Sequence, residues 1–246
     1  MAKQGGLGDN FYWGGVDLSG DVGAIGRVGG GLTGTQDVTG INKFAFERRG
    51  LLRDGGMEWT SFLNPAAAAA HPTLSTRPTT DEHATYFRGT TLGNPAASLV
   101  AKQINYDPTR GADGSLTIAV QALANGYGLE WGVQLTAGKR SDTTATNGTS
   151  VDFAAAGTHG LQAWLHVFSF TGTSCTVKLQ SSSDNGSTDA FADVTGGGFT
   201  AATGVTSERI TVSGNVERYL RAVTTGTFTE CTFAVQVTVN ATAVVF

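Results

Sequence analysis

The chain has 246 residues, a formal net charge of −4 and a charged fraction of only 15%, well below the quarter that is usual for a globular domain. This length suits one large all-β domain or two small ones with a real core. The net acidic charge gives no indication of a basic surface for binding nucleic acid, and no apolar run approaches the length of a membrane span. The first ten residues carry no apolar signal core, so we expect folding in a reducing cytoplasm.

Glycine punctuates the first part of the chain, which reads "WGGVDLSGDVGAIGRVGGGLTGTQDVTG" up to residue 40. This spacing favours an extended segment that takes shape against a neighbour over a self-contained core. We therefore expect residues 1–40 to form a glycine-rich N-terminal arm. Gly23–Gly31 looks like a phosphate-binding loop, but no helix pattern follows it and the lysine of such a loop is missing.

Residues 41–136 contain short runs of strand-forming residues between turn signals, which predicts a first β module. In the clearest run, alternate side chains share one face: Leu116, Ile118, Val120 and Ala122. One short helix is expected at "NPAAAAAH", with Asn64 as its N-cap, Pro65 at its first position and Pro72 as its stop.

The second half of the chain starts after a polar stretch, residues 137–149, which has no periodicity and is expected to be a linker or a mobile loop. Strand patterns resume over residues 150–246 and predict a second β-sandwich module. Cys175 and Cys231 each fall on the apolar face of an alternating strand. They are therefore expected to be small core residues, in preference to a disulfide or a metal pair.

A short internal repeat, called the echo here, occurs once in each half of the chain. "TIAVQALAN" (Thr117–Asn125) recurs as "TFAVQVTVN" (Thr232–Asn240), with five residue types in matching places. Duplication of one β module explains the echo, and so does chance similarity among strands rich in threonine and valine. Both explanations stay open.

No pattern of catalytic or metal-binding residues stands out. The four histidines are His71, His83, His159 and His166, and none has a metal-ligand partner at the usual spacing. A nucleophile elbow is absent. The sequence therefore predicts a protein that is not an enzyme and holds no cofactor or metal.

The acidic stretch "LQSSSDNGSTDAFADVTG" raises the question of a calcium-binding loop. Its aspartates, Asp184, Asp189 and Asp193, lack the spacing and the closing glutamate of a helix-flanked calcium loop. Asn185-Gly186 is a strong hairpin-turn dipeptide, because both residues tolerate positive φ. The stretch is therefore expected to be the tip of a β-hairpin.

A mixed-charge segment, "FERRGLLRDGG", is the best candidate for a contact between subunits. Its charged residues are Glu47, Arg48, Arg49, Arg53 and Asp54. Alternating signs suit pairing with a neighbouring subunit better than phosphate binding. A solvated loop is the alternative.

Long runs of the chain resemble the major tail proteins, or tail tube subunits, of long-tailed, non-contractile phages that infect actinobacteria. They include "GVDLSGDVGAIGRVGGG", "DVTGINKFAFERRGLLRDGGMEWTSFLNPA", "TYFRGTTLGNPAASLVAKQINYDPTRGADGSLTIAVQ" and "VERYLRAVTTGTFTECTFAVQVTVN". The resemblance covers nearly the whole chain and contains no catalytic signature.

This resemblance implies a structural virion protein of the tail, assembled in the host cytoplasm, with a barrel-forming β-sandwich fold and a short helix. Subunits of such proteins form rings, here of six chains or of three with pseudo-sixfold symmetry. The rings stack into a tube that DNA crosses without specific binding, and they meet tape-measure, terminator and distal tail proteins. An acidic lumen would repel the DNA backbone. Deleting residues before Asp37 is then expected to leave a folded, soluble chain that does not polymerise.

The alternative function is a β-sandwich binding module of the tail that recognises carbohydrate on the host surface. It would need exposed aromatic side chains, for which the candidates are Trp13, Tyr127, Trp131 and Trp164. Trp164 lies within an alternating strand, which favours a core position.

Overall fold

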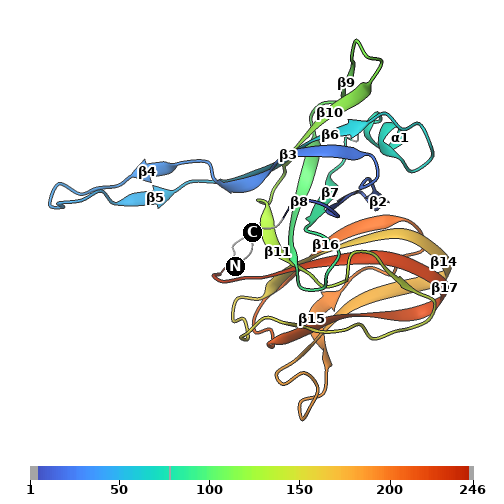
Figure 1. Cartoon of the computed structure of the whole chain (residues 1–246). Helices are drawn as coiled ribbons and strands as arrows, with labels where there is room; N and C mark the ends of the chain where they lie inside the picture. Colours follow the sequence, from blue (N-terminus) through green and yellow to red (C-terminus); the bar gives the residue numbers. More distant parts are fainter. Residues whose placement is uncertain (1–4, 78, 244–246) are drawn as a thin grey trace.

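The computed structural model describes residues 5–77 and 79–243, and within them the chain is almost entirely β-structure (Figure 1). The elements of the N-terminal lobe are β1 (Asn10–Trp13), β2 (Val16–Asp17), β3 (Val22–Leu32), β6 (Arg53–Phe62), α1 (Ala70–Leu74), β7 (Glu82–Phe87), β8 (Pro95–Gln103), β9 (Asp107–Arg110), β10 (Leu116–Ala124) and β11 (Glu130–Gln134). The C-terminal lobe contains β12 (Arg140–Asp142), β13 (Val151–Asp152), β14 (Leu161–Ser182), β15 (Ala192–Gly198), β16 (Thr206–Val212) and β17 (Tyr219–Val239). Two further strands, β4 (Thr35–Asp37) and β5 (Arg48–Gly50), lie between β3 and β6. The predicted all-β class with one short helix is confirmed.

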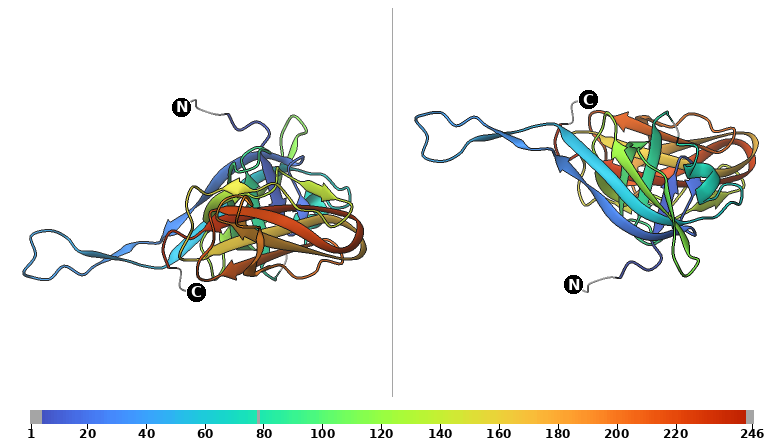
Figure 2. Two further views of the ribbon diagram at one scale, coloured as in Figure 1. Left: turned by 90° about the horizontal axis from the view of Figure 1, so that it is seen from below. Right: turned by 90° about the horizontal axis from the view of Figure 1, so that it is seen from above.

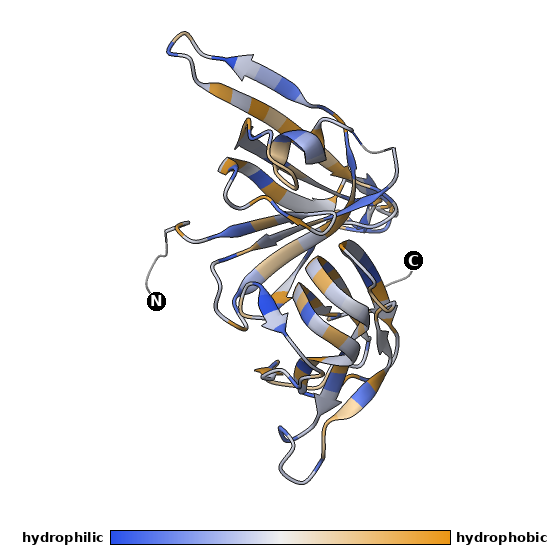
Figure 3. Ribbon diagram, turned by 90° about the vertical axis from the view of Figure 1, so that its right-hand side faces the viewer, coloured by the Kyte–Doolittle hydropathy of each residue, from blue (hydrophilic) through white to orange (hydrophobic). Residues whose placement is uncertain are grey.

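One hydrogen-bonded sheet runs through both lobes, in the order β15-β14-β17-β11-β8-β10-β6-β3. The path is open and ends at β15 and β3, so among the described residues a single chain closes no barrel. The joint between the lobes is β11, which pairs with β8 on one side and with β17 on the other. Figure 3 shows the two lobes one above the other, with apolar stretches along the strands of each.

The C-terminal lobe is a two-layer sandwich made mainly from two very long strands. β14 and β17 pair from Leu161↔Val239 to Ser182↔Tyr219, with register shifts around Gly172. Such bulges bend a strand and increase its twist. Side chains from both halves of this ribbon share one core, which shows that the ribbon folds over on itself. Cys175 and Cys231 lie in that core as free thiols, as the alternation predicted.

The first half of β14 and the last part of β17 are buried on both faces. One face points into the sandwich. The other face meets the N-terminal lobe, where Tyr12, Phe87, Ala96 and Ala234 form a small separate core. Trp164 is fully buried, so its predicted core position is confirmed.

The N-terminal segment is largely part of the fold, which differs from the expected arm of residues 1–40. Phe11, Tyr12 and Trp13 are almost completely buried, and β1 pairs with β7. β3 forms a ladder with β6 from Val22↔Ser61 to Leu32↔Arg53. Glycine spacing was compatible with this outcome, because glycine tolerates an edge strand and close backbone contacts as readily as a loose arm.

The helix begins later than the sequence predicted. Asn64 caps a local turn, in which its Oδ1 accepts a hydrogen bond from the amide of Ala66, and Ala68 has a positive φ of 54°. α1 then runs from Ala70 to Leu74 and includes Pro72. Proline is tolerated there because it lies in the first turn, where the amide has no helical partner. The expectation that Pro72 ends the helix was wrong.

Residues 137–149, expected to be a linker or mobile loop, pack against the C-terminal sandwich. β12 pairs with β17 through Arg140↔Phe233 and Asp142↔Cys231. The echoed segments of the two halves lie in β10 and β17, and both strands have neighbours on each side. Within the described residues, no helix has the length and apolar content that a membrane crossing needs.

Candidate assembly surface: the hairpin arm and the β3 groove

The most exposed part of the molecule is a long β-hairpin, residues 33–52, which we call the hairpin arm. It leaves the body where the β3–β6 ladder ends and continues as the two-stranded sheet of β4 and β5. Main-chain bonds hold it along its length, from Thr33 N to Leu52 O (2.8 Å) out to Val38 N to Glu47 O (2.9 Å). Both views of Figure 2 show it projecting far from the body.

Large apolar side chains of the hairpin arm point into solvent. The exposed ones on the arm and at its root are Leu32, Val38, Ile41, Phe44, Phe46, Leu51 and Leu52. Ile41 and Phe44 at the tip are as exposed as in an extended peptide, at 109% and 107%. The mixed charge of this segment predicted a subunit contact, but that prediction gave the apolar residues Phe44 and Phe46 no role. The missed signal is an apolar run within a segment bounded by glycines, with no partner strand to cover it.

The five predicted inter-subunit residues lie along one strand of this arm and at its root. Near the tip, Glu47 pairs with Lys43 at 2.9 Å and Arg48 lies over the ring of Phe46. Arg49 is exposed on β5. At the root, Arg53 makes an ion pair of 2.8 Å with the largely buried Glu130.

Asp54, also at the root, accepts a hydrogen bond from the amide of Gly55. The five residues therefore form two groups, with Glu47, Arg48 and Arg49 toward the tip and Arg53 and Asp54 at the body. Their contact with another subunit stays a prediction.

Strand β3 is the last strand of the main sheet. Its sequence, "VGAIGRVGGGL", contains five glycines, and within the described residues it pairs only with β6. Two glycines of the pair leave no room for a side chain: a Cβ on Gly55 would lie 2.7 Å from Leu129, and one on Gly30 would lie 2.6 Å from the carbonyl oxygen of Asp54 on β6 and 3.0 Å from Leu129. The other edge of β3 presents a row of main-chain groups to solvent, which is a template for pairing with another chain.

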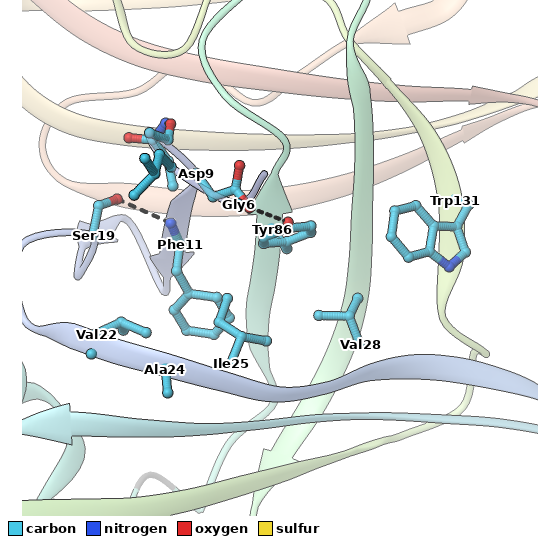
Figure 4. Close-up of a pocket in the computed structure, with 14 residues that line it drawn as sticks. Gly6, Asp9, Phe11, Ser19, Val22, Ala24, Ile25, Val28, Tyr86 and Trp131 are labelled. Atoms are coloured by element: carbon cyan, nitrogen blue, oxygen red, sulfur yellow. Dashed lines mark hydrogen bonds between the residues drawn. The ribbon is translucent and has the colours of Figure 1, made fainter. Parts of the chain in front are cut away.

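A groove of about 590 Å³ opens beside β3 and is called the β3 groove here (Figure 4). Its apolar lining comes from β1, β3, β7, β11 and the segment that precedes β1, with the side chains of Leu7, Phe11, Val22, Ala24, Ile25, Val28, Tyr86 and Trp131. Trp131 is half exposed at its opening and meets the edge of the Tyr86 ring.

One rim of the β3 groove is polar. Asp9 accepts hydrogen bonds from the hydroxyl of Tyr86 and from Arg88, with which it forms an ion pair. Burial, reinforced by the bond to Asp9, raises the pKa of Tyr86 to about 12. The Tyr86 hydroxyl therefore stays protonated and holds Asp9 in place at neutral pH.

A buried polar cluster joins the two lobes. His166 on β14 accepts a hydrogen bond at Nδ1 from the amide of Gly15 and is bonded through Nε2 to Thr85 Oγ1 at 2.8 Å. Thr85 in turn is bonded to Ser98, and His83 is bonded to Ser207 at 2.9 Å. Burial lowers the pKa of His166 to about 3, because no negative partner compensates a charge there.

The other titratable residues considered from the sequence are hydrogen-bonded to neighbouring residues of the chain. His71 is hydrogen-bonded to Tyr106 at 2.6 Å. Asp184 accepts hydrogen bonds from the hydroxyl of Thr188 and from the amides of Ser187, Thr188 and Asp189. These bonds, and the hydroxyl bond most of all, hold the pKa of Asp184 well below its usual range. In residues 5–77 and 79–243 no group of three histidine, cysteine or acidic side chains is placed to hold a metal ion.

The acidic stretch is a hairpin tip, as its turn dipeptide predicted. Asn185 and Gly186 have φ values of 63° and 80° and connect β14 to β15. Asp193 lies on β15, where it is bonded to Gln180 and Lys178. Its carboxylate is therefore engaged by the neighbouring strand, away from the tip.

Of the four aromatic residues considered for carbohydrate binding, Trp13 and Trp164 are buried. Tyr127 is covered by the guanidinium of Arg209, whose carbon lies 3.7 Å from the ring centre. Trp131 alone among the four offers a half-exposed ring. The four do not form a common platform.

No protein-family model matches the chain, and no curated protein matches it. A chain from the tail of an empty GTA particle, solved by helical refinement with sixfold symmetry, aligns with 52% of this chain and 98% of its own length, at 14% identity and a TM-score of 0.39. The Dit protein of phage SPP1, described as a paradigm of the hub adsorption apparatus in phages that infect Gram-positive bacteria, aligns with 93% of this chain and 98% of its own, at 13% identity and a TM-score of 0.32. Neither likeness assigns the chain to a family.

Proposed function

We propose that the chain is a structural subunit of a phage tail, without enzymatic activity, that assembles with copies of itself into rings stacked as a tail tube. The observation that carries the proposal is the hairpin arm, a 20-residue projection between Leu32 and Arg53 whose apolar side chains have no cover in the monomer. A single two-stranded hairpin is marginal in water. Covering this one by another subunit would remove the exposed apolar surface.

A second feature supports association side by side. The outer edge of β3 offers main-chain donors and acceptors over 11 residues, and the glycines that line it place few side chains in the way of an added strand. Pairing of this edge with a strand of a neighbouring copy would continue the sheet around a ring of three or six chains. A ring closes the edge that the single chain leaves open.

Composition and sequence resemblance agree with this role. The acidic balance of the chain, −4 overall, suits a channel that lets DNA pass without binding it. The resemblance of long runs to tail tube subunits adds the place in the virion. The same resemblance implies partners at the ends of the tube, the terminator and distal tail proteins, and one within its channel, the tape-measure protein.

Assembly of the purified full-length chain tests the proposal. Negative-stain electron microscopy and light scattering should show rings or tubes for the natural chain. A variant in which residues 34–51 are replaced by an Asn-Gly turn should stay a folded monomer, because the β3–β6 ladder keeps its register. A natural chain that stays monomeric at high concentration, or an arm-less variant that still assembles, contradicts the proposal.

A further inference from the structure

We infer that the tip of the hairpin arm of one subunit docks in the β3 groove of a second copy of this chain, with Phe44 as the side chain that enters it. This inference rests on the proposed function, since it requires that copies associate. It adds the acceptor site, which lies on β1, β3, β7 and β11.

The tip needs a partner surface. Ile41 and Phe44 are fully exposed, and Phe46 is covered only by Arg48 of the same arm. The whole arm supplies about as many residues as one side of a standard protein interface, roughly 20–30. A projection of this size with an apolar end is therefore suited to form one side of a protein–protein interface.

The β3 groove has the matching properties. Figure 4 shows Phe11, Ile25 and Val28 around the opening and Trp131 at its side. The volume of about 590 Å³ lies within the range of pockets that enclose compact apolar groups. An aromatic anchor seated in such a pocket is the usual centre of binding energy in an interface.

Geometry makes the occupant a different copy. The root of the arm is fixed by the pairing of Leu32 with Arg53, and the arm extends away from the body that carries the groove (Figure 1). Two complementary surfaces far apart on one chain meet only between copies, in a head-to-tail contact. Contacts of this kind generate rings or open stacks, which are the assemblies that the proposed function requires.

Charge orients the same contact. The charged residue that lines the groove is acidic, Asp9, whereas the arm beside the anchor Phe44 carries Arg48 and Arg49 in addition to the internally paired Lys43 and Glu47. Asp9 is already paired with Arg88, so the apolar fit supplies most of the contact and the opposite charges favour one orientation.

Disulfide trapping between two different chains tests the contact directly. A chain with Asn42→Cys, an exposed position on the tip that leaves the Phe44 anchor in place, is mixed with a Trp131→Cys chain under mild oxidation with copper phenanthroline. The native Cys175 and Cys231 are fully buried and do not compete. The mixture should give a cross-linked dimer that neither chain gives alone. Leu116→Cys in place of Trp131→Cys is the matched control, because Leu116 is exposed but does not line the groove, and it should give none.

A groove-filling variant and an intrinsic fluorophore extend the test. Ala24→Phe, introduced into the Trp131→Cys chain, should lower the cross-linked yield about tenfold or more, since Ala24 lines the groove on its exposed side. In the otherwise natural chain Trp131 is the exposed tryptophan and the other three are buried. Its emission should shift to the blue as the chain concentration rises through assembly, and Trp131→Phe should remove that shift.

The outcomes separate the two ideas. Assembly seen by light scattering, without the cross-link between residues 42 and 131 and without the fluorescence shift, overturns the docking site and leaves the proposed function standing. A chain that stays monomeric by light scattering overturns the proposed function, and the docking site with it. Cross-linking that is specific to the mixed chains and blocked by Ala24→Phe supports the site.

Discussion

His166 accepts a hydrogen bond at Nδ1 from the main-chain amide of Gly15 across 3.2 Å, and the two residues lie 151 positions apart. Because the amide can only donate, Nδ1 carries no proton and Nε2 donates to Thr85. The neutral imidazole is thus the form that joins the two lobes.

Acid should therefore loosen this chain at pH values where most of its carboxylates are still charged. Burial lowers the pKa of His166 to about 3, and burial, helped by Arg209, lowers that of His83 to about 4. The unfolded chain binds these protons near pH 6.5 and the folded chain does not. The two histidines contribute full stability above pH 6.5, and the contribution is lost as the pH falls from 6.5 toward 4 and 3, with a limiting slope of about 1.4 kcal/mol per pH unit for each.

Urea unfolding at several pH values measures that slope. His166→Asn removes one titrating group and should flatten the profile between pH 6.5 and 4. His159→Asn is the control, because His159 is exposed, and should leave the profile as it is. A profile in the His166 variant that is as steep as in the natural chain would show that other groups cause the acid loss.

Gly132 should tolerate no side chain. It lies on β11 opposite β17, where a Cβ would sit 2.1 Å from the carbonyl oxygen of Val237 and 2.4 Å from Gln236 Nε2. Gly132→Ala should force the joint between the lobes apart and lower the free energy of unfolding by about 1–3 kcal/mol or more. Gly128→Ala, whose Cβ would meet nothing closer than 3.4 Å, is the matched control in thermal unfolding.

Removal of residues before Asp37 should abolish folding, contrary to the expectation from glycine content. The deletion takes away three aromatic side chains of the core and the strand that pairs with β6. Trp13→Ala alone should cost about 3–5 kcal/mol. Circular dichroism of the truncated chain and of the arm-less variant described above makes the comparison, and a truncated chain with native-like spectra and a cooperative melt would contradict this prediction.

Two arginine–aspartate pairs of similar geometry should differ in importance. Arg140 binds Asp142 through bonds of 2.8 and 2.6 Å, and both side chains are mostly buried. Asp142→Ala should cost about 3–5 kcal/mol because it leaves the charge of Arg140 buried without its partner. Arg218 and Asp152 form the same bidentate pair with both side chains over two-fifths exposed, and Asp152→Ala should have a much smaller effect in the same unfolding assay.

The strand faces of the C-terminal lobe could be predicted from alternation, because one side of the sheet is always apolar. Cys175 and Cys231 are examples. The segment around Trp164 and His166 is buried on both faces, and only the position of the N-terminal lobe explains why a tryptophan and a histidine lie inside. Nothing local marks that contact.

The structures of the glycine-rich N-terminal segment and of the alanine-rich segment could not be predicted correctly, because each depends on contacts with other parts of the chain. Glycine spacing is compatible with an arm and with an edge strand, and the partner strand β6 decides between them. The five alanines favour a helix by propensity, yet Asn64 and Ala68 bend the chain first. The candidate site was located only in part, because mixed charge pointed to Arg48 and Arg49, whereas nothing local shows that the apolar residues beside them stay uncovered.

The ladder at the root of the hairpin arm determines how the subunit would carry a mechanical load. β3 and β6 lead directly into the arm, and their hydrogen bonds lie across the direction in which the arm points. A pull along the arm moves β3 and β6 together and therefore loads in shear the row of bonds between β6 and β10, through which this hairpin joins the rest of the sheet. Stretching of an assembly held through the arm would be resisted by that whole row of bonds at once, whereas a sideways peel of β6 from β10 would open the pairs one at a time.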